Sequence, residues 1–588
     1  MVRSPGSLAA PGRLKARWVL AQPQPLWASR LAAQLGISPV LAQCLINRGL
    51  TDPETGRHFL EPRLSRLRDP FLLPGMRAAV ERLEQARACK QPLVIFGDYD
   101  VDGVSASALL SEVLQQLGWS CSVYLPHRLD EGYGLSVEAV QNCLKQHPAR
   151  LLLAVDCGST AYNTVQSLQA QGVDVIILDH HQLSDPAPPA TALINPRLAA
   201  GADSCEAPGI ELCSVGLAFK LAHALVKQAR QQGRPEAQHL DLRHWLDLVA
   251  LGTIADVVPL TGENRILVRT GLIRLNQTQR PGLHALREVA RCARPLDPYS
   301  VGFQLAPRLN AAGRLETAHI ALQLLQAPSD ESAHLLAEQL DARNRERQSI
   351  EREILEEVYQ RLQDGFDPAN HYVIVEADPR WHLGVVGVVA ARLVQEFHRP
   401  AVVLGGDQHC LRGSGRSIPG FDLAAGLRAC SDLLLRHGGH ALAAGLSVDP
   451  TRLPLLRARL NELARRWLPP EALQPALHID AEVALAELTP SAVRELDRLK
   501  PAGPGNPPVH LLVRGLKSHR PLQRFGTAFQ HVRLWVTDGR TVREAVWWSG
   551  GLQEQLPIGS FDLVVAPYWH TWDGHGAVRL RVLDWRPA

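Results

Sequence analysis

Residues 93–114 read LVIFGDYDVDGVSASALLSEVL, and this stretch decides the fold class of the chain. Its first four residues form a continuous apolar run, as in a strand buried on both faces of a parallel sheet, and residues 106–114 restore a helical period. The acidic loop between them therefore joins a strand to a helix. Two later apolar runs end on Asp156 and Asp179. This alternation predicts an α/β domain built on parallel strands.

Acidic residues and two histidines gather at the ends of these apolar runs. Ligands collect beyond the carboxyl ends of the strands in an open α/β sheet, so we expect these strand ends to meet in one crevice. A fourth apolar run, 245–255, predicts a helix that ends on Asp256. One aspartate after a strand is more often a helix cap or a turn residue than a ligand. Four acidic ends, one of them followed by His180 and His181, favour a divalent metal centre, because Mn²⁺ and Mg²⁺ accept carboxylate and imidazole ligands.

Four short motifs at these ends carry a resemblance to a known superfamily. They are GDYDVDG at 97–103, AVDCG at 154–158, DHH at 179–181 and ADVVP at 255–259. In this order and spacing they resemble the signature motifs of the DHH phosphoesterases. Four further motifs narrow the resemblance, over nearly the whole chain, to the RecJ family of single-strand-specific exonucleases: PHRLDEGYGLS at 126–136, APRLNAAGRL at 306–315, GGHALAAG at 438–445 and PAGPGNP at 501–507.

The resemblance implies a ligand set and a catalytic pair. In the pyrophosphatase branch of the superfamily, a metal-binding histidine stands four residues before Asp100, where this chain has Phe96, and we expect Asp98 to replace it in part. Asp156 is the expected bridge between two cations, and His181 is the expected catalytic residue that faces the substrate. The implied ligands of two Mn²⁺ or Mg²⁺ ions are Asp98, Asp100, Asp102, Asp156, His180 and Asp256.

Phosphate contacts are expected from three glycine-rich stretches. RGSGRSIPG at 412–420 alternates Arg with Gly and Ser, which permits close backbone approach and bidentate arginine contacts. HGGHALAAG at 437–445 predicts His440 at the start of an apolar helix, where exposed amides favour an anion. Such a turn is more often structural, but its resemblance to the DHHA1 motif favours a substrate contact. In APRLNAAGR at 306–314, the resemblance places three polar side chains near a substrate phosphate, and a structural salt bridge is the alternative for Arg314. The expected substrate-binding residues are therefore Arg308, Asn310, Arg314, Arg412, Ser414, Arg416, Gly438, Gly439 and His440.

The chain is expected to fold as five parts. Neither Gly nor Pro occurs between Asp330 and Gly365, so a single helix of roughly 50 Å is predicted there, at about 1.5 Å per residue. A coiled coil is the alternative, but its heptad pattern is not sustained. The fold class is therefore α/β, with two α/β domains joined by a long helix around a central cleft, and a C-terminal β-barrel. The expected boundaries are 1–85 for an N-terminal extension that leans on the catalytic domain, 86–325 for the DHH catalytic domain, 326–368 for the connecting helix, 369–468 for the DHHA1 substrate-binding domain and 469–588 for the barrel.

The C-terminal part shows the period of β-strands. HVRLWV at 531–536 and AVRLRVL at 577–583 alternate apolar with polar or aromatic residues, so one face of each strand should be buried. From residue 501 onward, ten Lys or Arg stand against six Asp or Glu. Arginines mixed with aromatic residues suit a sequence-tolerant single-strand groove, and the resemblance implies an OB fold. Packing in the core is the alternative for Trp547, Trp548, Trp569 and Trp572.

Composition sets the remaining expectations. A net charge of +3 argues only against nonspecific coating of duplex DNA. The ten cysteines include no CxxC pair and are interpreted as reduced thiols. No apolar run is long enough to cross a membrane, so the expected location is cytoplasmic. A monomer is expected, and the resemblance implies single-stranded DNA, a DNA helicase and a single-strand-binding protein as partners.

The expected reaction is metal-dependent hydrolysis of phosphodiester bonds in single-stranded DNA, with release of 5′ mononucleotides. Its 5′ to 3′ direction and a role in DNA repair and recombination are implied by the resemblance alone. Two alternatives stay open. A DHH enzyme that acts on short oligonucleotides or cyclic dinucleotides would share the ligands but not need the barrel. A non-catalytic nucleic-acid scaffold would show eroded ligands, whereas every acidic position is present here.

Overall fold

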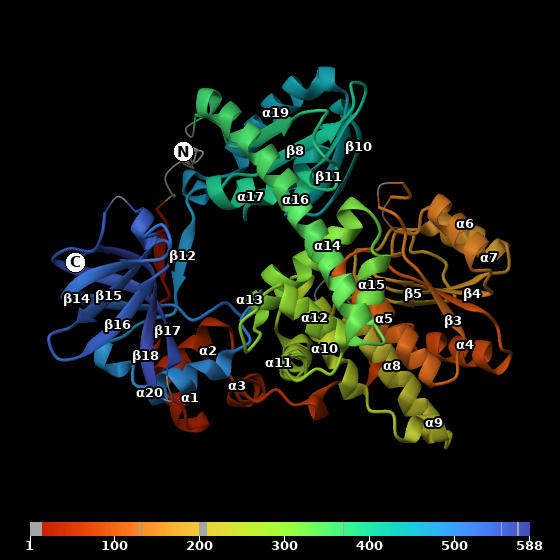
Figure 1. Ribbon diagram of the computed structural model, residues 1–588, viewed down its shortest axis with the longest axis horizontal. Helices are drawn as coiled ribbons and strands as arrows, with labels where there is room; N and C mark the ends of the chain where they lie inside the picture. The colour runs from red at the N-terminus through yellow and green to blue at the C-terminus, as the bar shows by residue number, and fades with distance from the viewer. Residues whose placement is uncertain are drawn as a thin grey trace. The chain divides into compact units, whose positions relative to one another are not determined.

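The computed structural model describes residues 15–588, apart from 129, 133, 199–208, 368–369, 554 and 573–574. These residues form two compact units (Figure 1). One unit comprises Gln339–Leu477 with the described part of Met1–Val19, and the other comprises Leu20–Glu338 with His478–Ala588. Among the described residues, no helix is both long and apolar enough to cross a membrane.

A five-stranded parallel sheet forms the centre of the catalytic part, as the sequence predicts. Its strands are β2 Leu93–Phe96, β3 Cys121–Tyr124, β4 Leu151–Val155, β5 Asp174–Leu178 and β6 Ala192–Ile194, in the order β3-β2-β4-β5-β6. The next strand along the chain, β3, pairs with one side of β2, and the strand after it, β4, pairs with the other side. The order of the strands therefore switches between β2 and β4, and a doubly wound sheet binds ligands at the carboxyl ends of such a pair.

Helices cover this sheet and place one apolar helix beside it. α5 is buried along almost its whole length and packs against α8 and α10. Because α10 is apolar all round, it lies in the interior and carries Asp256 at its C-terminal end. The helices of this part are α4 Met76–Ala88, α5 Val101–Gln116, α6 Val137–Gln146, α7 Tyr162–Ala170, α8 Ser214–Gln231, α9 Pro235–Gln238, α10 Leu246–Ala255, α11 Gly262–Asn276, α12 Pro281–Val289, α13 Pro298–Ser300, a π-helical turn Val301–Leu305, α14 Ala306–Leu315 and α15 His319–Leu325.

The predicted long helix is present as α16, Asp330–Gly365, which has 36 residues. Its first turn carries Asp330 and Glu331, whose negative charges favour a helix N-terminus. Along its middle, Arg347 reaches Glu351 one turn later, at 2.7 Å between Nη1 and Oε2. These features stabilise one continuous helix without a coiled-coil partner.

The second α/β fold contains a mixed sheet in the order β10-β11-β9-β8-β7. Its strands are β7 Ile374–Ala377, β8 Ala401–Gly406, β9 Leu411–Arg416, β10 Leu434–Gly439 and β11 Ala443–Val448, and its helices are α17 Val386–Phe397, α18 Leu423–Arg428 and α19 Leu453–Trp467. The helix predicted after His440 is wrong, because residues 434–448 form a β-hairpin. The alanines and leucine of 441–444 favour a helix locally, but β11 pairs with both β9 and β10, and this tertiary pairing overrides local propensity.

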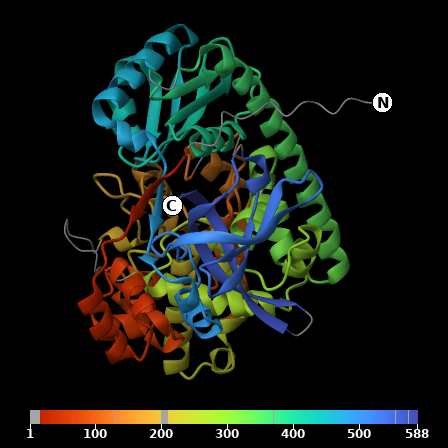
Figure 2. The same ribbon diagram turned by 90° about the vertical axis from the view of Figure 1, so that its left-hand side faces the viewer.

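The C-terminal part is a closed five-stranded barrel, which faces the viewer in Figure 2. Closure follows because β14 pairs with both β15 and β17. Val532, Leu534 and Val536 are buried as predicted. Trp547 belongs to the core and Trp569 packs against it, whereas Trp548 is 49% exposed. The strands are β14 Leu511–Phe525, β15 His531–Thr537, β16 Val542–Trp547, β17 Ser560–Trp572 and β18 His575–Pro587, joined by β13 Ala481–Glu482 and α20 Pro490–Leu496.

Three N-terminal helices, α1 Pro25–Leu35, α2 Pro39–Asn47 and α3 Pro53–Leu60, pack against this barrel. Their buried residues and those of the barrel form one hydrophobic core, and Figure 1 shows α1 and α2 beside α20. The expected contact with the catalytic domain exists at Phe59, whose ring lies 3.8 Å from the Arg265 guanidinium carbon. The shared core with the barrel is a further contact, which sequence reasoning did not predict. A short strand before them, β1 Arg17–Leu20, pairs with β12 Ala476–Ile479.

Candidate metal centre

All six predicted ligand residues come together at the carboxyl ends of β2, β4 and β5. Potential ligand atoms form three groups, and the atoms of each group lie within 4.8 Å of one another: Asp98, Asp100 and Asp156; Asp102, His180 and Asp256; and Asp156, His180 and His181. Asp156 and His180 each belong to two of these groups. The fold therefore gathers residues from four separate segments into one cluster, as the position of the switch point requires.

The loop after β2 orients its carboxylates through its own backbone. Asp100 caps α5, and its Oδ1 accepts hydrogen bonds from the amides of Asp102 and Gly103 at 2.9 and 3.2 Å. Gly103 lies so close to Asp98 that a β-carbon there would be 2.8 Å from the Asp98 amide nitrogen. The glycine of the GDYDVDG motif therefore permits the tight turn that brings Asp98 and Asp102 into the interior.

Asp156 adopts an unusual backbone conformation, with φ of 65°. A non-glycine residue in this left-handed region carries strain that the surrounding structure must hold, and such residues cluster at functional sites. Its amide donates to the Leu178 carbonyl at 3.0 Å, and its Oδ1 accepts a hydrogen bond from the Ser214 hydroxyl at 2.8 Å. The side chain is thereby held in the centre of the cluster.

The N-terminus of α8 holds two carboxylates, a feature that sequence reasoning missed. The amides of Ser214 and Val215 donate to the two oxygens of Asp102 at 2.7 and 2.9 Å, while the Ser214 hydroxyl reaches Asp156. Amides at a helix N-terminus stabilise negative charge. A serine directly before the apolar stretch 215–226 was the available signal, since that pattern marks a helix start.

Asp179 positions His181. The His181 Nδ1 lies 2.7 Å from Asp179 Oδ1, and Asp179 Oδ2 accepts from the Ser159 amide at 3.1 Å. Burial opposes charge on both groups, yet their mutual hydrogen bond prevails, so it lowers the pKa of Asp179 and raises the pKa of His181. His180 points to the cluster instead, with Nε2 3.6 Å from Asp156 Oδ1 and 3.5 Å from Asp256 Oδ2.

The cluster has an excess of negative charge that fits divalent cations. Burial first, and neighbouring carboxylates second, raise the pKa of Asp102 to about 7 and that of Asp256 to about 9, and raise the pKa values of Asp98 and Asp156 well above the usual range. Within the described part of the chain, the buried Asp98 Oδ1 and Asp256 Oδ2 have no hydrogen-bond partner. Hard oxygen ligands with one imidazole match Mn²⁺ or Mg²⁺.

Helix α14 braces the acidic loop. Asn310 Oδ1 accepts a hydrogen bond from the Val101 amide at 3.0 Å, and a β-carbon at Gly313 would lie 2.7 Å from the Tyr99 carbonyl oxygen. Asn310, which we expected to contact substrate, thus contacts the metal-site backbone, whereas Arg308 donates to the Gln304 carbonyl of the preceding helical turn. The motif APRLNAAGR therefore holds the loop that carries Asp98, Asp100 and Asp102.

A cation also lies beside this loop. The Arg128 guanidinium carbon is 5.0 Å from the centroid of the Tyr99 ring, and its charge partly opposes the upward shift in the pKa of Asp98. Sequence reasoning used the PHRLDEGYGLS motif for the resemblance but did not single out this arginine. Arg128 thus places one positive charge close to the carboxylates of the acidic loop.

Arg412, Ser414 and Arg416 stand at alternate positions of β9, so they share one face of the second sheet. The first turn of α17 lies against this face, because a β-carbon at Gly387 would be 3.3 Å from Ser414 and 3.4 Å from the Arg416 Nη2. Arg416 Nη1 donates to the Ser414 hydroxyl and to the Gly415 carbonyl. Two of the predicted phosphate contacts are therefore held together next to a helix N-terminus.

The predicted residues Gly438, Gly439 and His440 lie at the tip of the β10–β11 hairpin. Gly439 has φ of 137°, and a β-carbon there would be 2.5 Å from the Ala443 carbonyl, so only glycine fits. Ala443 pairs with Arg416 on β9, which places the tip beside the end of the arginine-bearing strand. His440 is exposed at this tip.

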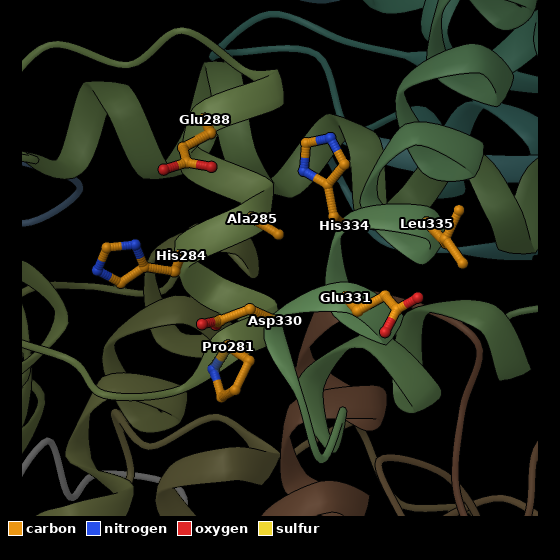
Figure 3. A pocket seen from close by; sticks show the side chains of 8 residues that line it. All are labelled: Pro281, His284, Ala285, Glu288, Asp330, Glu331, His334 and Leu335. Atoms are coloured by element: carbon orange, nitrogen blue, oxygen red, sulfur yellow. The ribbon is translucent and has the colours of Figure 1, made fainter.

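A cavity of about 580 Å³ lies elsewhere in the catalytic part, between α12 and the first turns of α16 (Figure 3). Its polar lining includes His284, Glu288, Glu331 and His334. The two histidine rings point in different directions in Figure 3, and none of the predicted site residues lines the cavity. The candidate site therefore remains the cluster at the carboxyl ends of β2, β4 and β5.

This fold and this cluster define a class of protein, the DHH family of metal-dependent phosphoesterases. Family models match the chain in three places: the DHH family N-terminal domain at residues 92–253, the DHHA1 domain at 370–466 and the RecJ OB domain at 479–584. The combination of the three models is more specific than the DHH match alone.

Individual relatives agree with the family models. The single-stranded-DNA-specific exonuclease RecJ of Bacillus subtilis is 35% identical over 97% of this chain and 71% of its own length. The crystal structure of RecJ from Thermus thermophilus in complex with Mn²⁺ has a TM-score of 0.81 and 31% identity, and covers 97% of this chain and 80% of that one. The Mg²⁺ complex of the same protein has a TM-score of 0.75 at 30% identity, with 97% and 78% covered. The chain belongs to the RecJ family of single-stranded-DNA-specific exonucleases.

Proposed function

We propose that this protein hydrolyses single-stranded DNA from its 5′ end and releases 5′ mononucleotides, with two divalent cations in the site that Asp156 centres. The observation that carries the proposal is the sharing of Asp156 and His180 between neighbouring groups of ligand atoms. A pair of adjacent sites with a common carboxylate is the arrangement that two-metal hydrolases use. Metal dependence and an exonuclease activity on single strands follow from membership of the RecJ family.

The proposed ligands form overlapping groups around the shared carboxylate. Asp156 groups with Asp98 and Asp100 and, separately, with His180 and His181, and His180 also groups with Asp102 and Asp256. Bound Mn²⁺ or Mg²⁺ supplies the positive charge that activates a water molecule and stabilises the entering and leaving oxygens. The chain itself contributes the fixed geometry, because α8 and α14 hold the carboxylates through hydrogen bonds to Asp102, Asp156 and the Val101 amide.

His181 is the proposed catalytic side chain that faces the substrate. Its Nδ1 is engaged by Asp179, and the raised pKa means that the ring holds a proton on Nε2 over more of the neutral range. A proton held there can be donated to a phosphate oxygen or a leaving oxygen. Asp179 acts through His181 and is a positioning residue.

Phosphate contacts are proposed for the face of β9 and for the hairpin beside it. Arg412, Ser414 and Arg416 offer guanidinium and hydroxyl donors at alternate positions of one strand, and the first turn of α17 adds a helix N-terminus. Gly438, Gly439 and His440 follow at the hairpin tip. Arg308 and Arg314 are proposed to contact a phosphate near the acidic loop, whereas Asn310 acts on that loop directly.

A single-strand grip is proposed for the aromatic surface of the barrel, defined as Phe525, Phe529, His531 and Trp548. The His531 and Trp548 rings lie 4.7 Å apart, the Phe525 and Trp548 rings 5.7 Å apart, and Phe529 is 64% exposed in the loop between β14 and β15. Arg533 adds a cation 5.4 Å from the Phe525 ring. Exposed rings beside cations stack on bases of any sequence.

The domain boundaries predicted from sequence remain proposals. A monomeric state and a cytoplasmic location also remain proposals. A role in DNA repair and recombination, and interactions with a helicase and a single-strand-binding protein, rest on the family resemblance alone.

Mn²⁺ titration of metal-free protein tests the proposed centre. Asp156→Asn should lower kcat on a 5′-labelled single strand by several powers of ten and weaken Mn²⁺ binding, while the affinity for DNA changes little. Glu138→Gln, a matched change of an exposed carboxylate on α6 of the same domain, should leave both quantities unchanged. Near wild-type turnover with unaltered Mn²⁺ dependence in Asp156→Asn would show that the centre is assigned wrongly.

A further inference from the structure

The segment that follows Asp256 is held by a loop from the C-terminal part of the chain. Residues 257–261 connect the end of α10 to α11, and residues 498–507, which contain the PAGPGNP motif, lie against them. The Leu260 amide donates to the Pro504 carbonyl at 2.8 Å. A backbone hydrogen bond therefore joins the proposed ligand segment to a stretch more than two hundred residues away in sequence.

Two glycines of the motif make this approach possible. A β-carbon at Gly503 would lie 2.7 Å from the Leu260 Cδ1, and one at Gly505 would lie 3.1 Å from Thr261 Cγ2 and 3.2 Å from Pro259 Cβ. Leu260 is 2% exposed, so its side chain has little room to move. The two glycines are needed because the loop packs directly onto the ligand segment.

Arg265 connects the same two segments from the start of α11. Its side chain is 1% exposed, and no carboxylate among the described residues forms an ion pair with it. The guanidinium instead donates at 2.8–3.5 Å to backbone carbonyls, which are those of Phe59, Arg498, Leu499, Lys500 and Pro501. A buried cation satisfied by carbonyls of one loop fixes the position of that loop against α11.

Asn506 completes the loop from within. It is fully buried, and its Nδ2 donates to the carbonyls of Leu499 and Pro501 at 2.7 and 2.8 Å. Its Oδ1 accepts a hydrogen bond at 2.8 Å from the Nε of Arg48, which caps the C-terminus of α2. Residues 498–507 are therefore a rigid, internally bonded element and not a passive linker.

The ligand segment has a reason to need this support. Val257, directly after Asp256, has φ of 61°, which is a strained conformation for a β-branched residue. Such strain persists only where neighbouring contacts hold the backbone. On one side Asn264 donates to the Pro259 carbonyl at 3.0 Å, and on the other side Pro504 accepts from Leu260.

We propose that residues 498–507 are a positioning element of the metal centre, which holds Asp256 in place through residues 257–261. The inference rests on the proposed role of Asp256 as a metal ligand. It means that the barrel does more than bind DNA, because the loop at its base completes the site where the chemistry takes place. Variants in this loop are expected to weaken metal binding even though none of its residues touches a metal.

Gly503→Ala in the full-length, metal-free protein provides the test. The added methyl group should displace Leu260 and break its hydrogen bond to Pro504, so hydrogen exchange of the Leu260 amide should become faster. Mn²⁺ affinity should fall about tenfold, the lower end of what loss of a supporting contact costs a metal site. Turnover at saturating DNA should fall equally on short and long strands. Gly505→Ala is the second variant, to be used if Gly503→Ala does not fold. Gly505 has φ of 70°, and its added β-carbon would meet longer contacts, so this variant should also speed Leu260 exchange and weaken Mn²⁺ binding.

Gly539→Ala is the matched control. This glycine also has positive φ, 93°, and belongs to the same barrel, but no atom lies within 4 Å of the added β-carbon. It should leave Leu260 exchange and Mn²⁺ affinity at wild-type values. Asp256→Asn provides the reference for complete loss of the ligand.

Two results would overturn the inference. Faster Leu260 exchange in Gly503→Ala with wild-type Mn²⁺ affinity would show that the loop does not position Asp256. Weaker Mn²⁺ binding without faster exchange would show that the effect does not pass through residues 257–261. If Asp256→Asn itself bound Mn²⁺ normally, the ligand assignment in the proposed function would be at fault, and the inference would fall with it.

Discussion

Ser214 links two of the proposed metal ligands, Asp102 and Asp156. Its hydroxyl donates to Asp156 and its amide donates to Asp102, and the side chain is fully buried at the start of α8. Because Asp156 already has strained backbone geometry, a fixed hydrogen bond to its carboxylate limits the orientations that it can adopt.

Ser214→Ala should therefore weaken Mn²⁺ binding by about tenfold to a hundredfold, the cost expected for a partner that orients a ligand, and lower kcat with little effect on KM for DNA. The control is Ser105→Ala on α5, which removes a buried hydroxyl that has no hydrogen-bond partner in the described structure. Isothermal titration of metal-free protein with Mn²⁺ gives the affinity of both variants. Equal affinity for Ser214→Ala and wild type would remove Ser214 from the account.

The carboxylate cluster also predicts how the metal-free protein responds to pH. The folded chain keeps protons on Asp102 and Asp256, whose pKa values are raised to about 7 and about 9, whereas these groups titrate near their usual value of about 4 in the unfolded chain. The folded state thus binds more protons between these limits, so its stability falls as pH rises from about 4 to about 9.

Melting temperatures of the metal-free protein should accordingly decrease over this range, and saturating Mn²⁺ should remove most of the decrease. Asp256→Asn should flatten the profile, since one of the raised pKa values is lost. Calorimetry at a series of pH values measures the slope. A melting temperature that rose with pH in the absence of metal would contradict the cluster of protonated carboxyls.

Sequence reasoning predicted a set of ligands that the structure brings together, but it did not predict the residues that support them. Each ligand follows an apolar run, and that local pattern reports a strand end or a helix end. The supports come from distant segments: Ser214 is 58 residues from Asp156, and Asn310 is 209 residues from Val101. Hydrogen bonds of this kind depend on how helices pack, which a single sequence does not encode locally.

At the scale of elements, β9 and the β10–β11 hairpin form the proposed phosphate-binding face. Arg416 and Ser414 are bonded to each other beside the first turn of α17. Such a site captures substrate without taking part in metal binding, so its loss should appear in KM and in the salt dependence of binding.

Arg416→Ala should raise KM for single-stranded DNA and reduce the slope of affinity against salt by about one phosphate contact, with Mn²⁺ affinity unchanged. Arg428→Ala, an exposed arginine on α18 of the same fold, is the control. Steady-state kinetics at several salt concentrations give KM and kcat for both variants. A loss of kcat at saturating DNA with unaltered KM would instead assign Arg416 to the transition state.

The hairpin shows where local pattern misleads. HALAAG is rich in helix-forming Ala and Leu, yet β11 lies between β9 and β10 with both edges paired. By contrast α16 was predicted over its full length, because a run without Gly or Pro and with many charged residues supports a helix wherever it is placed. Long periodic segments are therefore more predictable than short strands that depend on their neighbours.

At the scale of the whole molecule, the N-terminal helices combine with the C-terminal barrel into one part. The N-terminal helices α1–α3 and the C-terminal barrel share a core, and Arg265 joins Phe59 to residues 498–501. Sequence reasoning assigned these segments to separate parts, since nothing local marks a contact between residues more than four hundred positions apart. The strands of the C-terminal part were predicted from their period, whereas the barrel was implied by the resemblance that the motifs carry.

The aromatic surface predicts a dependence on substrate length. The double variant Phe529→Ala/Trp548→Ala should bind long single strands more weakly, by about 1 to 3 kcal/mol for each base that no longer stacks. Its affinity for very short oligonucleotides should change little. Ile558→Ala, an exposed apolar residue of the same barrel, is the control. Binding measured by fluorescence anisotropy over a series of strand lengths decides the matter, and an equal loss at every length would refute a grip at this surface.

The most direct test of the central claim follows one single strand, labelled either at its 5′ end or at its 3′ end, through a time course with the wild-type protein and Mn²⁺. The account predicts that the 5′ label appears at once as a mononucleotide, that the 3′-labelled strand shortens progressively, and that a chelator stops both reactions. Hydrolysis that persisted after removal of divalent metal, or mononucleotides released first from the 3′ label, would contradict it.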